Sequence, residues 1–118
     1  MTMQASSRQV DGVTIVDLTG SITVDEGSVV LRKTVRSLSK QGSSKILLNL
    51  AGVTSVDSSG IGELVSAFIS VRKAGGELKL LNLTSEVHDL LQITKLCAVF
   101  EVEDDEASAL AAFHADTA

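Results

Sequence analysis

The sequence predicts an α/β fold with one mainly parallel mixed β-sheet, an antiparallel hairpin at its N-terminal edge and about four α-helices. Three observations lead to this fold class. A turn signal near the N-terminus separates two strand-like segments, later strand-like segments are apolar on both alternations, and apolar residues at helical spacing follow them. Strands that alternate with helices in this way are typical of parallel sheets covered by helices on both faces.

The hairpin is the first predicted element. Gln9-Val10 and Val13–Leu18 flank Asp11-Gly12, a dipeptide that tolerates the positive φ angles of a tight hairpin turn. The second segment mixes aliphatic residues with Asp and Thr, which is typical of a strand with one face exposed to water. We therefore expect an antiparallel pair at the edge of the sheet.

A helix is predicted to follow the hairpin. Thr23 and Glu26 have the spacing of a capping box, which marks a helix start. Apolar residues then recur at helical spacing as far as Gly42, a glycine that stops the helix. These apolar residues are Leu31, Val35 and Leu38.

The next strand and helix form a predicted βα unit. Lys45–Leu50 is apolar on both alternations, as expected for a central strand covered on both faces. The segment Asp57–Ala74 has helical periodicity, and Gly75-Gly76 ends it. The apolar positions of this helix are Ile61, Leu64, Val65 and Phe68.

The second half repeats this alternation. Glu77–Leu83 has the pattern of a buried strand and Ser85–Ile93 that of a helix. A short apolar run, Ala98–Val102, is expected to form the last strand, and a helix from about Asp105 to Ala115 completes the chain. No linker or composition shift divides the sequence, so we expect one domain over residues 1–118.

Composition excludes several classes of protein. With 118 residues, of which 44% are apolar, the chain can bury a core without disulfides or metal. The net charge of −5 and the absence of Trp and Tyr disfavour nucleic acid as a partner. The sequence has no apolar run long enough to span a membrane. One cysteine and two histidines offer no zinc ligand set, and we expect Cys97 to be a small buried side chain in a reducing cytoplasm.

The residues most able to carry chemistry lie where the central strand gives way to a helix. We expect a short loop there, followed by a helix whose first turn contains Asp57, Ser58, Ser59 and Gly60. Such strand-to-helix loops commonly hold ligands or modified residues, but Asp and Ser are also ordinary helix caps. Gly60 and Gly62 fit either close approach of a partner or tight packing on the sheet.

Other chemistries find less support. The sequence lacks the Gly-x-Ser-x-Gly motif of serine hydrolases, the third glycine of a dinucleotide fingerprint and a Gly-Lys-Ser/Thr phosphate loop. The chain therefore offers no catalytic residue and no cofactor site. The acidic residues of Glu101–Glu106 are interpreted as a solvated face that partly supplies favourable charge at the start of the last helix.

The segment Asp57–Gly62, preceded by Leu47–Val53 and followed by Gly75–Leu80, resembles the STAS domain of bacterial anti-sigma-factor antagonists. Leu83–Val87 and the acidic stretch before Ala109 extend the resemblance over nearly the whole chain. The resemblance implies a STAS-like fold and makes Ser58 the phosphoacceptor. It assigns a supporting role in the switch to Asp57, Ser59, Gly60 and Gly62, and contacts with the partner to Thr23, Asp25, Ser55 and Ile61.

The resemblance also implies how such a protein acts. It would bind, when unphosphorylated, an anti-sigma factor that is also a serine kinase of the histidine-kinase-like ATPase type, and phosphorylation would release it. A serine phosphatase would restore binding, and the protein would be a cytoplasmic monomer or weak dimer without metal or cofactor. Two positions depart from the family pattern: Ile22-Thr23 replaces a common Leu-Asp, and Asn49 replaces a common Asp.

Three alternatives remain open at this point. A STAS scaffold subunit of a stress-sensing complex also presents a phosphorylatable serine in this loop. A STAS accessory subunit of a lipid-transport complex has the same fold. A small nucleotide-binding protein belongs to a different functional class.

Overall fold

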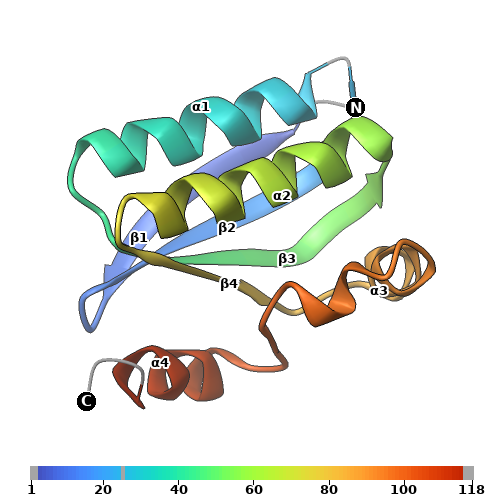
Figure 1. The fold of residues 1–118 in the computed structure, drawn as a ribbon. Helices are drawn as coiled ribbons and strands as arrows, with labels where there is room; N and C mark the ends of the chain where they lie inside the picture. Colours follow the sequence, from blue (N-terminus) through green and yellow to red (C-terminus); the bar gives the residue numbers. More distant parts are fainter. Residues whose placement is uncertain (1–2, 25, 116–118) are drawn as a thin grey trace.

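The computed structural model describes residues 3–24 and 26–115 (Figure 1). Its five strands have the order β1-β2-β3-β4-β5, with β1 antiparallel to β2 and all other neighbours parallel. This confirms the predicted fold class. The elements are β1 Gln4–Val10, β2 Val13–Ile22, α1 Gly27–Lys40, β3 Lys45–Val56, α2 Ser58–Lys73, β4 Glu77–Leu81, α3 Ser85–Ile93, the short 3-10 turn η1 Leu96–Ala98, β5 Val102–Glu103 and α4 Glu106–Ala115.

The hairpin turn forms as predicted. Asp11 and Gly12 have φ angles of 51° and 80°, the paired left-handed geometry that suits the twist of a two-residue hairpin. Both strands are longer than the sequence pattern indicated, because β1 pairs with β2 over seven residues, from Gln4 to Val10. Pairing with β2 thus places polar residues of β1 in a strand, although their own sequence pattern does not predict one.

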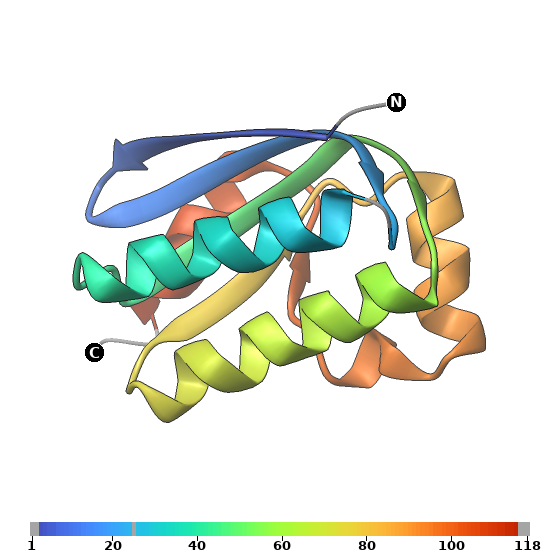
Figure 2. The same ribbon diagram turned by 90° about the horizontal axis from the view of Figure 1, so that it is seen from above.

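Helices cover both faces of the sheet, and β3 runs through its centre. Ile46, Leu48 and Leu50 enter the larger core beneath α1 and α2, whereas Leu47 points to a smaller core with Phe113 of α4. Figure 1 shows α1 and α2 side by side on one face and α4 on the other. Figure 2 shows α3 beside the end of the sheet where β3 runs into α2. β3 is therefore apolar on both alternations because both of its faces are buried, as the sequence predicted.

The stretch expected to be a loop before α2 is mostly strand. β3 continues to Val56 because it pairs with the far end of β2, where Gly52 lies opposite Thr19 and Val56 opposite Ile22. Only Asp57 separates the strand from the helix. This short connection fixes the direction in which α2 begins.

The capping box predicted for α1 does not form. Glu26 is the N-cap residue and makes no side-chain cap hydrogen bond. The carbonyl of Thr23 instead accepts from both the backbone N and the Oγ of Ser28, each at 3.0 Å. Gly27 lies directly against the end of β2, where an added Cβ would be 1.9 Å from the carbonyl oxygen of Ser21. This close packing, rather than a side-chain cap, sets the start of α1.

Two further expectations about the second half are corrected. Of the run Ala98–Val102, only Val102 lies in a strand: the chain makes a 3-10 turn over Leu96–Ala98, and the last strand, β5, has only the two residues Val102–Glu103. Cys97 is exposed rather than buried. Phe100 takes the core position nearby and packs edge-on against Phe68, with ring centroids 5.5 Å apart. The turn places the aromatic residue inward and leaves the thiol at the surface.

Candidate functional site

The start of α2 is organised by Asp57. Its carboxylate accepts a hydrogen bond from the backbone N of Gly60 at 2.9 Å, which is the N-cap interaction expected from the sequence. The same carboxylate accepts from the backbone N of Val24 at 3.0 Å. One side chain therefore joins the first turn of α2 to the segment that follows β2.

These bonds also fix the charge state of Asp57. The amide of Gly60 is the main cause of a lowered pKa for this carboxyl; burial opposes it, and the amides of Val24, Ser59 and Asp57 itself add to the lowering. An Asp with a lowered pKa is ionised at neutral pH. A negative charge therefore stands directly beside Ser58.

The two serines of the first turn differ in their surroundings. The Oγ of Ser59 lies 2.8 Å from the Oγ of Ser28, which itself donates to the carbonyl of Thr23. Ser59 must then be the donor to Ser28, and its side chain is half-buried. Ser58 is exposed, and its hydroxyl makes no hydrogen bond to any residue within 3–24 or 26–115. Of the two serines, Ser58 is the one that is exposed and has no hydrogen-bond partner among the described residues.

Gly60 and Gly62, in the first turns of α2, differ in the space around them. A Cβ at Gly60 would lie 2.1 Å from the carbonyl oxygen of Ile22 and 2.7 Å from Cγ1 of Val56. Gly60 is thus required for packing α2 against the sheet. A Cβ at Gly62 would have no atom within 4 Å, so this position is open surface. Of the two explanations that the sequence left open, packing applies to Gly60, whereas nothing inside the chain requires glycine at position 62.

The expected partner-contact residues lie in different environments. Thr23 is half-buried next to the start of α1, and Ser55 is half-buried and donates from its Oγ to the Oγ of Ser21 at 2.9 Å. Ile61 is a correction: it belongs to the main core with only 9% of its surface exposed, so its side chain is not available to a partner. Asp25 lies outside the described residues.

Two features of the site escaped sequence reasoning. Val24 is 65% exposed beside the start of α2, a large apolar side chain at a surface. A single valine after a strand has no periodicity that would reveal it. The bond from the Val24 amide to Asp57 links residues 33 positions apart, a separation that no local pattern reports.

Asn49, a departure from the family pattern, lies away from this site. It is opposite Asp17 in the β2–β3 register, on the sheet face covered by α4, and its Nδ2 donates to Oδ1 of Asp17 at 2.8 Å. Asp17 also accepts a hydrogen bond from Nε of Arg8 at 2.8 Å. The guanidinium of Arg8 is the main cause of a lowered pKa for Asp17, and the amide of Asn49 adds to it. Asn49 therefore serves a polar network between strands.

Comparison with known proteins gives the family. The model of the STAS domain matches residues 4–109. The chain is 36% identical over 87 residues to the anti-sigma-B factor antagonist of Bacillus subtilis, an alignment that covers 74% of this chain and 78% of that protein. The chain belongs to the STAS family of anti-sigma factor antagonists. It is 26% identical over 110 residues to the anti-sigma F factor antagonist of Paenibacillus polymyxa, covering 93% and 94%.

Solved structures of the family share the fold. The anti-sigma factor antagonist SpoIIAA in its unphosphorylated form has a TM-score of 0.69 and 17% identity, over 92% of this chain and 94% of that chain. The phosphorylated form of SpoIIAA from Bacillus has a TM-score of 0.68 and 19% identity, over 89% and 96%. Anti-sigma factor antagonists are regulators and not enzymes. Across the described parts of this STAS domain, no helix has the length and apolar character needed to cross a membrane.

Proposed function

We propose that this STAS domain is a phosphorylation-switched anti-sigma factor antagonist. In the unphosphorylated form it binds an anti-sigma factor that is also a serine kinase with a histidine-kinase-like ATPase fold, and phosphorylation of Ser58 ends the binding. The observation that carries this proposal is the contrast between the two serines. Ser58 is exposed at the start of α2 with an unengaged hydroxyl, whereas Ser59 is held by Ser28.

The fold can accept a phosphate at this position. A phosphoserine adds about −1.5 to −2 charges, and the first turn of a helix offers free N–H groups and the positive end of its dipole. Ser58 is the first residue of α2, at the surface, so the added group displaces no core side chain. We expect the phosphorylated domain to stay folded.

Binding should be lost for an electrostatic reason. Phosphorylation takes the net charge from −5 to about −7 and adds the new charge next to the ionised Asp57. A partner surface built around a neutral hydroxyl would have to bury this charge without a matching cation, which is costly. The neighbouring carboxylate of Asp57 is also an anion, so it repels the phosphate and cannot neutralise its charge.

The remaining parts of the proposal follow from the family. Two relatives are named as antagonists of anti-sigma factors, and one protein of this fold has been solved both with and without phosphate. A serine phosphatase would reset the switch in the cytoplasm. We infer one domain that works as a monomer or weak dimer without metal or cofactor. Thr23 and Ser55 are the candidate partner-contact residues, and Gly62 belongs to the switch loop that supports Ser58.

The test uses the purified chain, its anti-sigma factor and ATP. Intact-mass measurement should show one added phosphate, abolished in Ser58→Ala and retained in Ser59→Ala. Ser58→Ala should still bind the anti-sigma factor, because removal of a hydroxyl introduces no charge. Full phosphorylation of the Ser58→Ala protein would refute the assignment.

A further inference from the structure

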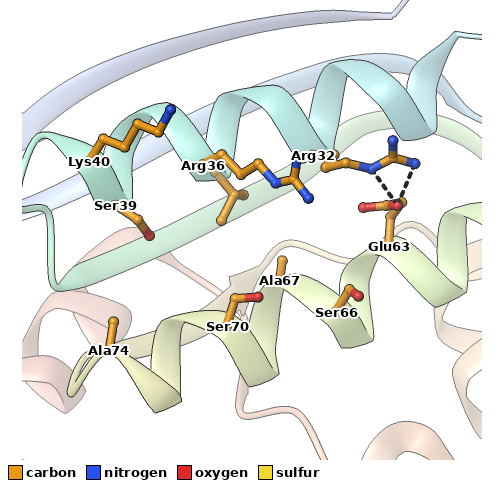
Figure 3. Close-up of a pocket in the computed structure, with 10 residues that line it drawn as sticks. Arg32, Arg36, Ser39, Lys40, Glu63, Ser66, Ala67, Ser70 and Ala74 are labelled. Carbon is orange, nitrogen blue, oxygen red and sulfur yellow. Dashed lines mark hydrogen bonds and ion pairs between the residues drawn. The ribbon is translucent and has the colours of Figure 1, made fainter.

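A groove between α1 and α2 is lined by residues other than those of the Ser58 site. It has a volume of about 400 Å³. Figure 3 shows the side chains of α1 along one wall and those of α2 along the other. The α1 wall carries Arg32, Arg36 and Lys40, and the α2 wall carries Glu63, Ser66 and Ser70, with Ala74 directly after the helix. The floor includes Val35 and Ala67, both buried.

The groove lies in a basic part of an acidic protein. α1 and α2 together hold six of the ten Lys and Arg residues of the chain but only one carboxylate, Glu63. The chain as a whole has a net charge of −5. Positive charge is thus concentrated on the helical layer that forms the groove, and an anionic ligand is its electrostatic complement.

Only one of the three groove cations is paired within the described residues. Arg32 donates to Oε1 of Glu63 from Nε at 2.9 Å and from its terminal nitrogen at 2.8 Å. Glu63 therefore neutralises one end of the row. Arg36 and Lys40 are exposed and form no ion pair with a carboxylate of residues 3–24 or 26–115. Arg36 and Lys40 are therefore available to pair with an anionic ligand.

The shape of the groove selects among anionic ligands. Arg32, Arg36 and Lys40 are spaced four residues apart, so they repeat about every 6 Å along α1. Carboxylates four residues apart on another helix repeat at the same interval, whereas a single phosphate group reaches only one or two of these cations. Beyond Glu63, the α2 side of the groove has only small side chains, which lets a third helix approach to a packing distance of about 8–10 Å.

We propose that this groove docks an acidic amphipathic helix of a partner protein. Carboxylates on every fourth residue of that helix would pair with Arg36 and Lys40, and its apolar side chains would lie over Val35 and Ala67. This surface is separate from the Ser58 switch and does not depend on the phosphorylation proposed there.

The test uses a synthetic helical peptide of about 20 residues, long enough to be helical in water, with Glu at every fourth position of one face and Leu beside it. The matched peptide has Gln in place of Glu. Each is titrated into the isotopically labelled chain and followed by NMR at low salt. We expect the amides of α1 and α2 around the groove to shift, tenfold weaker binding of the Gln peptide, and weakening of the Glu peptide by added salt.

Variants of the chain distinguish binding in the groove from general electrostatic attraction of the acidic peptide. Arg36→Glu with Lys40→Glu should weaken binding at least tenfold. Lys33→Glu is the matched control, because Lys33 is exposed on the same helix but does not line the groove; it should weaken binding less than twofold. Ser70→Phe fills the α2 wall without changing charge and should also weaken binding at least tenfold. All four positions are exposed, so melting curves should stay close to those of the parent chain.

Four results would overturn the proposal. Equal losses in Lys33→Glu and the double variant would show diffuse attraction, and unchanged binding of Ser70→Phe would show that the groove is not occupied. Inorganic pyrophosphate that shifts the same amides at lower concentration than the peptide would indicate a small-anion site. Self-association in sedimentation, abolished by the double variant, would indicate that a second copy of this chain fills the groove.

Discussion

Replacing Gly60 by Ala should destabilise the domain, although Ala is the better helix former. The new methyl group would lie 2.1 Å from the carbonyl oxygen of Ile22, a distance that no side chain tolerates. The obstacle is backbone at the end of β2, so rotation of a side chain cannot relieve it. The start of α2 would have to move away from the sheet.

The magnitude follows from two opposing effects. Overpacking of a tight site costs about 1–3 kcal/mol. Ala in place of Gly inside a helix returns about 0.5–1 kcal/mol. Because the clash is with backbone, the cost lies near the upper end of its range, and we expect Gly60→Ala to lower the free energy of unfolding by about 2 kcal/mol, with a fall in Tm of roughly 4 °C for each kcal/mol in a domain of this size.

Gly62→Ala is the matched control, two residues further along the same helix. No atom lies within 4 Å of the added methyl group, so only the gain of about 0.5–1 kcal/mol remains. Urea unfolding followed by circular dichroism measures both variants, and unchanged m-values would show that neither variant alters the surface exposed on unfolding. A Gly60→Ala protein as stable as the parent would refute the close packing of α2 against β2.

Three further predictions concern the site and the surface. Ser58→Asp should reproduce part of the effect of phosphate, lowering affinity for the anti-sigma factor in calorimetric titration while Tm stays near that of the parent; a collapse of Tm would show unfolding instead. Because the pKa of Asp57 is lowered on folding, its stabilising effect is present above the ordinary Asp pKa and disappears as pH falls through the lowered value. The difference in Tm between the parent and Asp57→Ala should therefore be largest near neutral pH and shrink in acid, and a constant difference would contradict this. Cys97 should react fully with a thiol reagent in the native protein, whereas reaction only in denaturant would contradict its exposure.

Local signals were sufficient for much of the fold. Asp11-Gly12 indicated the hairpin turn because only two residues decide its backbone geometry. The bounds of α3, Ser85–Ile93, were read correctly, and Thr84 accepts a bond from the Val87 amide at its start. The cap formed by Asp57 was likewise visible, since it acts within three residues.

The errors share a different physical origin, because they depend on residues far apart in the chain. The extension of β3 to Val56 is decided by pairing with β2, and the position of α1 by contact with Ser21. The two serines of the first turn were told apart by the family resemblance alone, because the hydrogen bond that distinguishes them depends on Ser28, which lies 31 residues before Ser59. The burial of Ile61 and the exposure of Cys97 likewise depend on how whole elements pack.

The unequal placement of charge gives this domain a large electric dipole. α1 and α2 carry a net charge of +5 and the rest of the chain −10, including Glu101–Glu106 leading into α4 on the opposite face of the sheet. In the field of a charged surface the molecule would rotate before it touches, turning its helical layer toward anions and the α4 face toward cations. Total charge alone would predict repulsion from every acidic protein. The dipole instead allows diffusional encounters with acidic proteins to begin in one preferred orientation, an effect that weakens as salt shortens the range of the field.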